Sequence, residues 1–349
     1  MKKLYVYLIT SLLFFSVFKA NAQNSFSDII KVSPSDATKL IDAYGEPLFK
    51  GFGVGMNSGW ANTAKVKKLL HFELRVTASV AYTPTADKSF DVTKIGLSNG
   101  VTPTDPNQTI TPTVGASKDV NGVTLNINDN NGRTVSTFTL PSGQLPKQLP
   151  GIPFPQVQLT VGLLERTDLT IRYVPTINVG SNIGSVNMIG FGLKHDLTKY
   201  IFGHAKKIIP FDLSVLLAYS RLNLNANVNV QPEAGSTGPN DDFSDQHIKG
   251  DFSSFLAEAI ISKKLLFFTP FLAVGYNTAS TNLAALGNYP VESGVDSYTV
   301  YTNPININET SISGFRADVG FQLNLGIRIF ASYSLAEYKS VNAGIGFGF

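Results

Sequence analysis

The last nine residues of the chain, 341–349, alternate between two kinds of side chain. The residues between the apolar ones are an asparagine and three glycines. Because strand side chains point alternately to opposite faces, this peptide as a strand is apolar on one face and nearly bare on the other. The end of the chain therefore predicts a strand with one face in apolar surroundings. Its apolar residues are Val341, Ala343, Ile345, Phe347 and Phe349.

Ten other segments show the same alternation of apolar with polar or small residues. Strands of about 9 to 12 residues suit a tilted crossing of a membrane. In one segment Val186 and Met188 have the opposite parity to Ile189 and Phe191, which predicts a β-bulge near Met188. The segments are 51–60, 72–82, 156–163, 169–175, 186–193, 211–219, 255–261, 268–276, 315–325 and 327–335.

The chain begins with the features of a secretory signal peptide. Lys2 and Lys3 precede an apolar run, and Ala20-Asn21-Ala22 forms an A-x-A cleavage site, so we expect cleavage after Ala22. Without the three lysines of this segment, the mature chain balances its 25 acidic residues with as many basic ones. Its charge therefore gives no reason to expect a nucleic-acid partner. The chain contains no cysteine, which excludes disulfides and thiolate metal sites.

Export, alternating strands and an aromatic carboxyl end together predict a protein of the bacterial outer membrane. We expect an all-β fold, a transmembrane antiparallel up-and-down β-barrel of about 12 strands, in a range of about 10 to 14. Since such barrels normally have an even number of strands, one of the eleven is missed, miscounted or replaced by an N-terminal segment in the lumen. Outer-membrane lipid would surround the barrel, and Phe347 and Phe349 would form the signal for the barrel-assembly machinery.

The connections between the predicted strands differ in length in a way that sets the orientation. If the C-terminal strand descends to the periplasm, the short connections at 164–167, 262–264 and 324–326 lie inside, as is typical of such barrels. A small hairpin around Asn130-Asn131-Gly132 is predicted within the longest outer loop. The outer loops are 83–155, 223–249 and 283–311. The lysines placed at the inner rim are Lys65, Lys67, Lys68, Lys199, Lys206, Lys207, Lys263 and Lys264.

The segment before the barrel is predicted to be a short helix. Ser35 and Asp36 can cap it, and Gly45 and Pro47 end it. We expect this helix to close one mouth of the barrel from the surface, and the alternative is a plug inside the lumen. The predicted domains are a signal peptide, 1–22, an N-terminal helical plug or lid, 23–50, and the barrel, 51–349. Glycines of the first strand would allow close contact with such a plug. They are Gly51, Gly53, Gly55 and Gly59.

Charged residues occur on the polar faces of several predicted strands. At membrane depth they must face a lumen, because an arginine or lysine on the lipid face costs about 2 to 4 kcal/mol. They form either an internal salt-bridge network that fills a narrow barrel or a constriction that selects a solute. The residues are Glu73, Arg75, Arg172, Glu258, Arg316 and Asp318.

The usual signatures of enzymes are missing from the sequence. The four histidines form no HExxH motif, and no GxSxG nucleophile elbow is present. His71 lies on a predicted lumen face and would be the best candidate for a catalytic residue. We therefore expect no enzyme, no cofactor and no metal site.

Three motifs carry a resemblance to known barrels: residues 46–53 (EPLFKGFG), 57–60 (NSGW) and 192–197 (GLKHDL). Through them the chain resembles a group of uncharacterised outer-membrane barrels from the Bacteroidetes, over most of its mature length. More remotely, the N-terminal segment and the Lys-His-Asp turn look like those of the FadL-type long-chain fatty-acid transporters. That resemblance implies a lumen plugged by the N-terminus and passive uptake of hydrophobic molecules. The chain departs from it in having fewer than the fourteen strands typical of those transporters.

Two functions therefore stay open. The first is a passive channel or transporter for small molecules, with a hydrophobic ligand as a partner. The second is a structural or surface-interaction barrel with a sealed lumen and functional outer loops.

Overall fold

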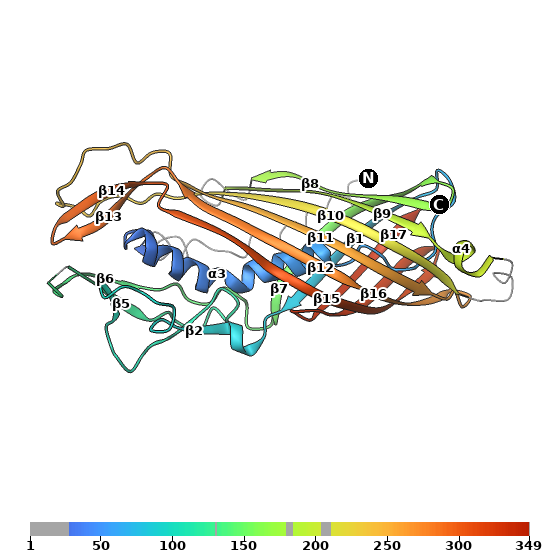
Figure 1. Ribbon diagram of the computed structural model, residues 1–349, viewed down its shortest axis with the longest axis horizontal. Coiled ribbons are helices and arrows are strands. Elements are labelled where there is room, and N and C mark those ends of the chain that lie inside the picture. The colour runs from blue at the N-terminus through green and yellow to red at the C-terminus, as the bar shows by residue number, and fades with distance from the viewer. Residues whose placement is uncertain (1–27, 130, 179–183, 204–210, 349) are drawn as a thin grey trace.

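The computed structural model describes residues 28–129, 131–178, 184–203 and 211–348 (Figure 1). In this part of the chain ten antiparallel strands close into an up-and-down barrel, which confirms the predicted fold class. The count is ten, the low end of the predicted range, and not twelve. β1 pairs with both β7 and β17 and so closes the ring. The strands are β1 (Phe72–Tyr82), β7 (Gly151–Leu164), β8 (Thr167–Asn178), β9 (Ser185–Asp196), β10 (Asp212–Asn227), β11 (His247–Ser262), β12 (Phe268–Leu286), β15 (Ile305–Leu325), β16 (Ile327–Leu335) and β17 (Ser340–Gly348).

The segment predicted as the first strand, 51–60, is mostly helical. α3 (Pro34–Asn57) begins after Ser33, whose hydroxyl accepts a hydrogen bond from the Asp36 N–H at 3.2 Å, and it continues through Pro47. The predictions of a cap at Ser35 and an end at Gly45 are therefore wrong. Burial of the helix inside the barrel outweighs the low helix propensity of glycine and proline. Removing this segment from the strand count leaves the ten strands observed.

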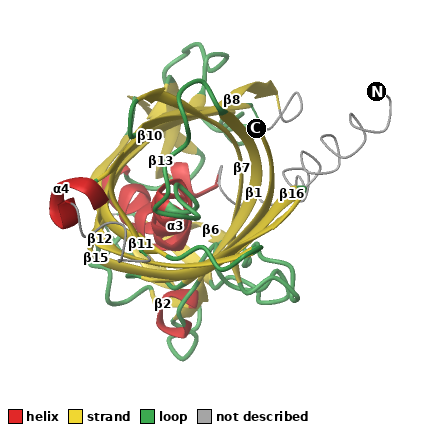
Figure 2. Ribbon diagram, turned by 90° about the vertical axis from the view of Figure 1, so that its right-hand side faces the viewer, coloured by secondary structure: helices red, strands yellow, loops and turns green. Residues whose placement is uncertain are grey.

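The alternating glycines of α3 belong to two faces of a helix. A Cβ atom at Gly51 or Gly55 would lie 2.5 Å from the side chain of Ile152 or Phe154 on β7. A Cβ atom at Gly53 would lie 2.6 Å from that of Ala279 on β12. Seen along the barrel, α3 lies inside the ring of strands (Figure 2). The helix thus occupies the interior and does not cover the mouth from outside.

The two ends of the barrel differ in their connections. At the inner end the strands are joined by short turns, apart from the β9–β10 connection, which carries α4 (Thr198–Phe202). At the outer end lie the long loops, with a hairpin of β13 (Asn288–Gly294) and β14 (Ser297–Thr302). The hairpin predicted in the longest loop is confirmed, as β5 pairs with β6. That loop ends where β7 begins, before the predicted boundary at 155. Its elements are η2 (Thr85–Lys88), β2 (Ser89–Asp91), β3 (Val101–Pro103), β4 (Ile110–Pro112), β5 (Thr124–Asn128) and β6 (Thr134–Thr139).

The apolar and polar faces of the wall exchange sides part-way along the barrel. On β10, Leu217 and Tyr219 face outward and are 52% and 48% exposed. Two residues further on, the outward position is Arg221, and the apolar Leu222 on the opposite face is 4% exposed. The inner half of the barrel is therefore apolar outside, and the outer half is apolar inside.

This exchange of faces explains the change of parity on β9. Met188 faces the apolar interior of the outer half, whereas Phe191 faces outward in the inner half. β9 pairs with β10 without a register shift, so the predicted bulge near Met188 is wrong. The irregularity lies in β8, between Val174 and Ile177.

The interior of the outer half is a hydrophobic core built around α3. Ile30, Leu40 and Phe49 are at most 2% exposed there. The helix contacts the strand wall on one side and the longest loop on the other (Figure 1). Wall and loop residues in this core include Val92, Leu125, Phe138, Leu140, Val186, Met188, Leu222, Ile248, Phe252, Leu283 and Ile305.

Candidate functional site in the plugged lumen

All six charged residues predicted for the lumen face the interior, and each is at most 7% exposed. The structure brings them around the inner end of α3 and an irregular segment, residues 58–71, which we call the strap. The strap leads from the end of α3 to the start of β1. Glu73 and Arg75 belong to β1, Arg172 to β8, Glu258 to β11, and Arg316 and Asp318 to β15.

Arg172 binds the backbone at the end of α3. Its Nη1 and Nη2 donate to the carbonyl oxygens of Met56 at 2.7 Å and Ser58 at 2.6 Å, and its Nε donates to Gln158 Oε1 at 2.7 Å. Its guanidinium also stacks on Trp60, 3.6 Å from the ring centre. The last carbonyls of a helix have no partner within the helix and carry partial negative charge. An arginine is therefore suited to hold this end of the plug.

Arg316 forms a second cluster on the opposite part of the wall. Its Nε lies 2.9 Å from Asp318 and 3.5 Å from Glu258, and all three side chains are buried. The Nη2 atom donates to the hydroxyl of Ser58 at 3.2 Å. One charged cluster of the wall thus contacts the first residue of the strap.

Other polar side chains of the wall donate to further carbonyls of the plug. Arg75 donates to the carbonyl of Trp60 at 2.9 Å. Gln156 donates to that of Gly55 at 2.7 Å, and Gln158 to that of Gly59 at 2.9 Å. Together with the bonds to Met56 and Ser58, side chains of the wall donate to five of the six backbone carbonyls of residues 55–60.

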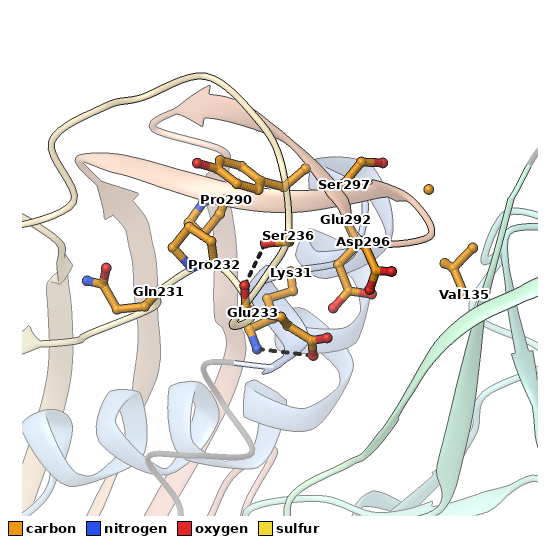
Figure 3. A pocket seen from close by; sticks show the side chains of 12 residues that line it. Lys31, Val135, Gln231, Pro232, Glu233, Ser236, Pro290, Glu292, Asp296 and Ser297 are labelled. Carbon is orange, nitrogen blue, oxygen red and sulfur yellow. Dashed lines mark hydrogen bonds and ion pairs between the residues drawn. The ribbon is translucent and has the colours of Figure 1, made fainter.

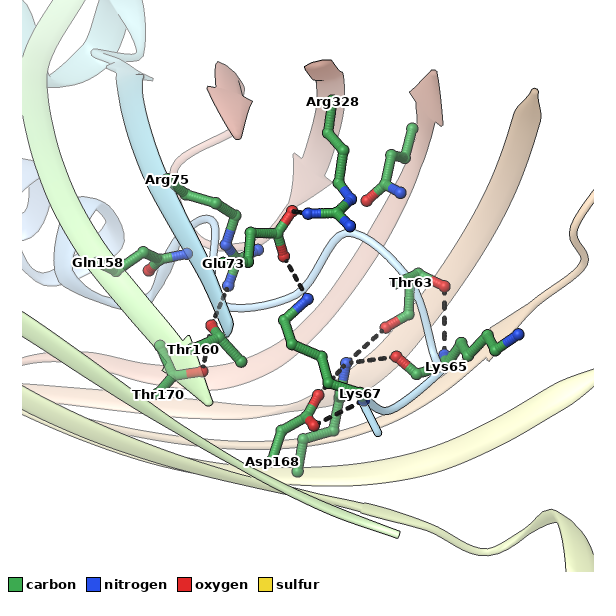
Figure 4. Close-up of polar contacts among 12 residues, drawn as sticks. Thr63, Lys65, Lys67, Glu73, Arg75, Gln158, Thr160, Asp168, Thr170 and Arg328 are labelled. Atoms are coloured by element: carbon green, nitrogen blue, oxygen red, sulfur yellow. Dashed lines mark hydrogen bonds and ion pairs between the residues drawn. The ribbon is translucent and has the colours of Figure 1, made fainter. Parts of the chain in front are cut away.

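A second layer of charges fixes the strap near the inner end (Figure 4). Lys67 lies 2.7 Å from Glu73, which also pairs with Arg328 at 3.2 Å. Lys194 pairs with Asp168 at 3.3 Å. Lys194 also donates to the strap carbonyls of residues 63 and 65 at 3.1 and 3.0 Å. An ion-pair network thus joins the strap to the wall at the inner end of the lumen.

Several residues of this site were not among the predicted ones. Gln156 and Gln158 lie on a polar face that the alternation does reveal, but neutral side chains gave no reason to select them. Asp168 lies between a predicted turn and a predicted strand, and Lys194 belongs to the Lys-His-Asp motif that is interpreted as a turn. Trp60, the single tryptophan of the chain, is the last residue of the predicted strand 51–60. The ion pair between β8 and β9 follows only from strand register.

The remaining predicted residues carry no charge that joins the lumen clusters. Gly59 has φ +71°, and a Cβ atom there would lie 2.8 Å from Asn342 on β17. Phe347 is exposed on the outer face of β17. Phe349, the signal peptide and its cleavage site lie outside the described residues. His71 is exposed at the inner end, in contrast to its predicted place on a lumen face.

At the outer side, ion pairs join α3 to its surroundings. Lys50 lies 2.8 Å from Glu46, 3.8 Å from Asp87 in the longest loop and 3.2 Å from Glu337 between β16 and β17. The hydroxyl of Tyr338 donates to Asp87 at 2.5 Å. These contacts tie the plug to two separate outer connections.

A shallow polar pocket lies at the outermost end, where the start of the described chain meets three loops (Figure 3). Lys31, Glu233, Glu292 and Asp296 line it, with Tyr298 at its edge. Burial and the neighbouring Glu233 carboxylate raise the pKa of Glu292 above its usual value. The pocket brings acidic groups together but gives no catalytic arrangement.

The residues that the structure describes contain no group of three or more histidine, cysteine, aspartate or glutamate side chains placed to hold a metal ion. None of their helices combines the length and apolar character needed to cross a membrane.

One family model matches the sequence, over residues 1–349, and it is described as DUF6588, a family of unknown function. The chain belongs to DUF6588. The likeness to FadL-type transporters and to barrels of the Bacteroidetes stays a prediction. No curated protein matches this DUF6588 chain.

Three solved structures with matching regions are bacterial surface barrels. The outer-membrane protease OmpT from Escherichia coli is 8% identical over 82% of this chain and 100% of its own, with a TM-score of 0.33. The translocator domain of the autotransporter NalP from Neisseria meningitidis is 12% identical over 90% and 97%, with a TM-score of 0.27. The attachment invasion locus protein Ail of Yersinia pestis, in complex with a heparin analogue, is 9% identical over 80% and 97%, also with 0.27. These scores are too low to support a conclusion about this chain.

Proposed function

We propose that this protein is an outer-membrane β-barrel whose N-terminal plug controls the passage of small molecules. The apolar outer surface of the inner half supports the membrane location. Exposed aromatic residues end this surface, with Tyr219 beside Phe255 and Tyr276 beside Phe315 on paired strands. Beyond them Arg221 pairs with an aspartate in solvent. An apolar band edged by aromatic residues is the surface that a barrel presents to lipid.

One observation carries the proposed gate: the plug is a separate segment whose inner end is held by polar side chains of the wall. An eight-stranded barrel can be filled by its own side chains, and a ten-stranded one has more room. In this chain that room holds α3 and the strap, which belong to no strand of the wall. Displacing them would leave a passage with charged side chains in its inner half and apolar side chains along the outer half.

The charges of the lumen suit small polar solutes. Arg75, Arg172 and Arg316 face the lumen together with Glu73, Glu258 and Asp318. A hydrophobic ligand, as expected from the FadL likeness, would gain no favourable contacts with these charged groups. Such a ligand suits the apolar interior of the outer half better. We propose small polar molecules as the transported class.

A reversible crosslink between plug and wall tests the gate. Ser58 Oγ lies 3.4 Å from Ser340 Oγ on β17, and both side chains are buried. Because the chain has no cysteine, Ser58→Cys with Ser340→Cys places the only possible disulfide there. Liposomes containing the protein would be tested for swelling in small sugars and amino acids, before and after reduction. The single Ser58→Cys variant is the matched control.

We expect swelling in the reduced state and its loss on oxidation. The same pair would also be tested with Arg172→Met, which weakens the hold on α3 and should increase swelling. Equal swelling with and without the disulfide would refute a gate formed by the plug. A lack of swelling even in the reduced Arg172→Met protein would refute passage altogether.

That second outcome would favour a sealed barrel that acts through its outer surface. The observation that supports this rival is the hydrophobic core that unites α3, the wall and the longest loop in the outer half. A core of this kind makes the outer half a rigid body suited to surface contacts. Shortening the loop between β5 and β6 should then abolish surface binding and leave the barrel folded.

A further inference from the structure

The turns at the inner end of the barrel carry large apolar side chains at their tips. Leu266, between β11 and β12, is 87% exposed, and Leu70, at the end of the strap, is 77% exposed. Leu164 and Leu325 are exposed at two other turns. Tips of turns in water usually carry glycine, asparagine or another polar residue. These leucines therefore indicate surroundings other than water.

The backbone conformation at two of these leucines is unusual for an apolar residue. Leu70 has φ +62° and Leu266 has φ +52°. Glycine and asparagine adopt this left-handed region with ease, whereas leucine is disfavoured there. Both turns thus hold an apolar side chain where the backbone alone would select glycine. Such strain persists where the side chain has a role.

The exposed leucines continue the apolar band of the barrel without a break. Phe267 follows Leu266 and leads into β12, whose Leu272 faces outward. Leu70 is followed by Phe72 and Leu74 on the outer face of β1. The surface of these turns is therefore the edge of the same surface that we place in lipid.

Basic residues accompany the leucines. Lys68 and Lys264 are exposed beside Leu70 and Leu266. Lys263 lies over the ring of Phe211, 5.5 Å from its centre. The exposed Glu165 is also at this end. Lysines whose stems lie along apolar surface can extend their charge to the phosphates of lipid head groups.

We infer that the inner turns are seated in the periplasmic leaflet of the membrane, with Leu70 and Leu266 among the lipid chains. Lys68, Lys263 and Lys264 bind the head groups of anionic phospholipids. The inference rests on the proposed location in the outer membrane. It adds a lipid-binding surface that fixes the depth of the barrel and holds the end of the strap.

Single cysteines in this cysteine-free chain test the inference. Leu70→Cys and Leu266→Cys would carry an environment-sensitive nitrobenzoxadiazole label in vesicles of phosphatidylcholine and phosphatidylglycerol. Val274→Cys on the apolar band and Asp242→Cys in an outer loop are the references for lipid and water. Quenching would be measured with nitroxide-labelled lipid and with aqueous iodide.

We expect the labels at 70 and 266 to be quenched by lipid nitroxide, as at 274, and several-fold less by iodide than at 242. Iodide quenching at 70 and 266 equal to that at 242, with 274 still quenched by lipid, would overturn the inference and leave the membrane location intact. Iodide quenching at all four sites would refute the location itself.

The lysines are tested by lipid preference. The combined substitutions Lys68→Gln, Lys263→Gln and Lys264→Gln should lower the enrichment of spin-labelled phosphatidylglycerol over phosphatidylcholine around the barrel. A control variant with Lys118→Gln and Lys147→Gln, at exposed positions of the outer loop, should not change it. An enrichment that is equal in all three proteins would overturn the assignment of these lysines.

Discussion

Replacing Arg172 with methionine should loosen the inner end of α3 and leave the barrel wall closed. The substitution removes the donors to the carbonyls of Met56 and Ser58 and to the side chain of Gln158. It also removes the stacking on Trp60. None of the ladder hydrogen bonds of β8 depends on this side chain, so the wall keeps its pairing.

The size of the effect follows from the contacts. A hydrogen bond to a charged group contributes about 1.5 to 3 kcal/mol, so the two bonds to plug carbonyls together contribute about 3 to 6 kcal/mol. Methionine avoids the cost of burying a guanidinium, which offsets part of this loss. We expect the plug to be destabilised by about 3 kcal/mol. Arg172→Lys should lose about half of that, because an ammonium cannot hold both carbonyls in the same way.

The stability of the plug can be measured directly through Trp60, the single tryptophan of the chain. Trp60 lies in the strap, and its ring N–H donates to the carbonyl of Met56 in α3. Urea unfolding in vesicles would be followed by tryptophan fluorescence for the plug and by far-ultraviolet circular dichroism for the barrel. In Arg172→Met the fluorescence transition should move to lower urea and separate from the barrel transition. Arg221→Met, on the outer surface, is the control and should change neither by more than about 0.5 kcal/mol. Coincident transitions with an unchanged midpoint in Arg172→Met would refute the assigned hold on α3.

Three further changes test other contacts of the plug and the outer end. Gly55→Ala should lower the stability of the plug by about 1 kcal/mol in the same fluorescence assay, because crowding against Phe154 exceeds the gain in helix propensity; a stabilised plug would contradict the tight packing. Glu292→Gln should raise the melting temperature at about pH 8 but not at about pH 3. The pKa of Glu292 is higher in the folded protein than in the unfolded chain, so its ionisation destabilises the folded protein, and this happens only at a pH above the ordinary pKa of glutamate. An equal shift at both pH values would contradict this. Lys194→Met should speed hydrogen exchange in the strap at least tenfold, because it removes the donor to the carbonyls of residues 63 and 65 and breaks a buried ion pair with Asp168; unchanged exchange would show that the strap is held elsewhere.

The strands of the barrel wall could be predicted because the alternation of apolar and polar side chains is a local property of the sequence. The segment 315–325 alternates without interruption, and β15 contains it in full. Register could then place Glu73, Arg75 and Arg316 on the lumen face, as observed. The strand count failed at one place only, where Gly51, Gly53 and Gly55 satisfy a strand pattern as well as two faces of a tightly packed helix.

The partners of the lumen charges could not be predicted, for a different reason. Arg172 binds backbone carbonyls, which every residue possesses, so no pattern of side chains marks their location. The ion pair of Lys194 with Asp168 depends on the register of β8 and β9. To predict these contacts of Arg172 and Lys194, one must know which segment fills the lumen. The alternation in residues 51–60 predicts a strand of the wall for the segment that forms the inner end of α3.

The exchange of faces along the barrel constrains how the plug can leave. Its outer part lies in a hydrophobic core, whereas its inner end is held by charges, so the two ends respond to different perturbations. The strap is continuous with β1 and fixes the inner end of the plug to the wall. α3 can therefore clear the lumen only by moving toward the outer end or by unfolding. Either movement also separates α3 from the longest loop, where Lys50 contacts Asp87. Opening of the barrel should thus depend on that loop as well as on the lumen charges.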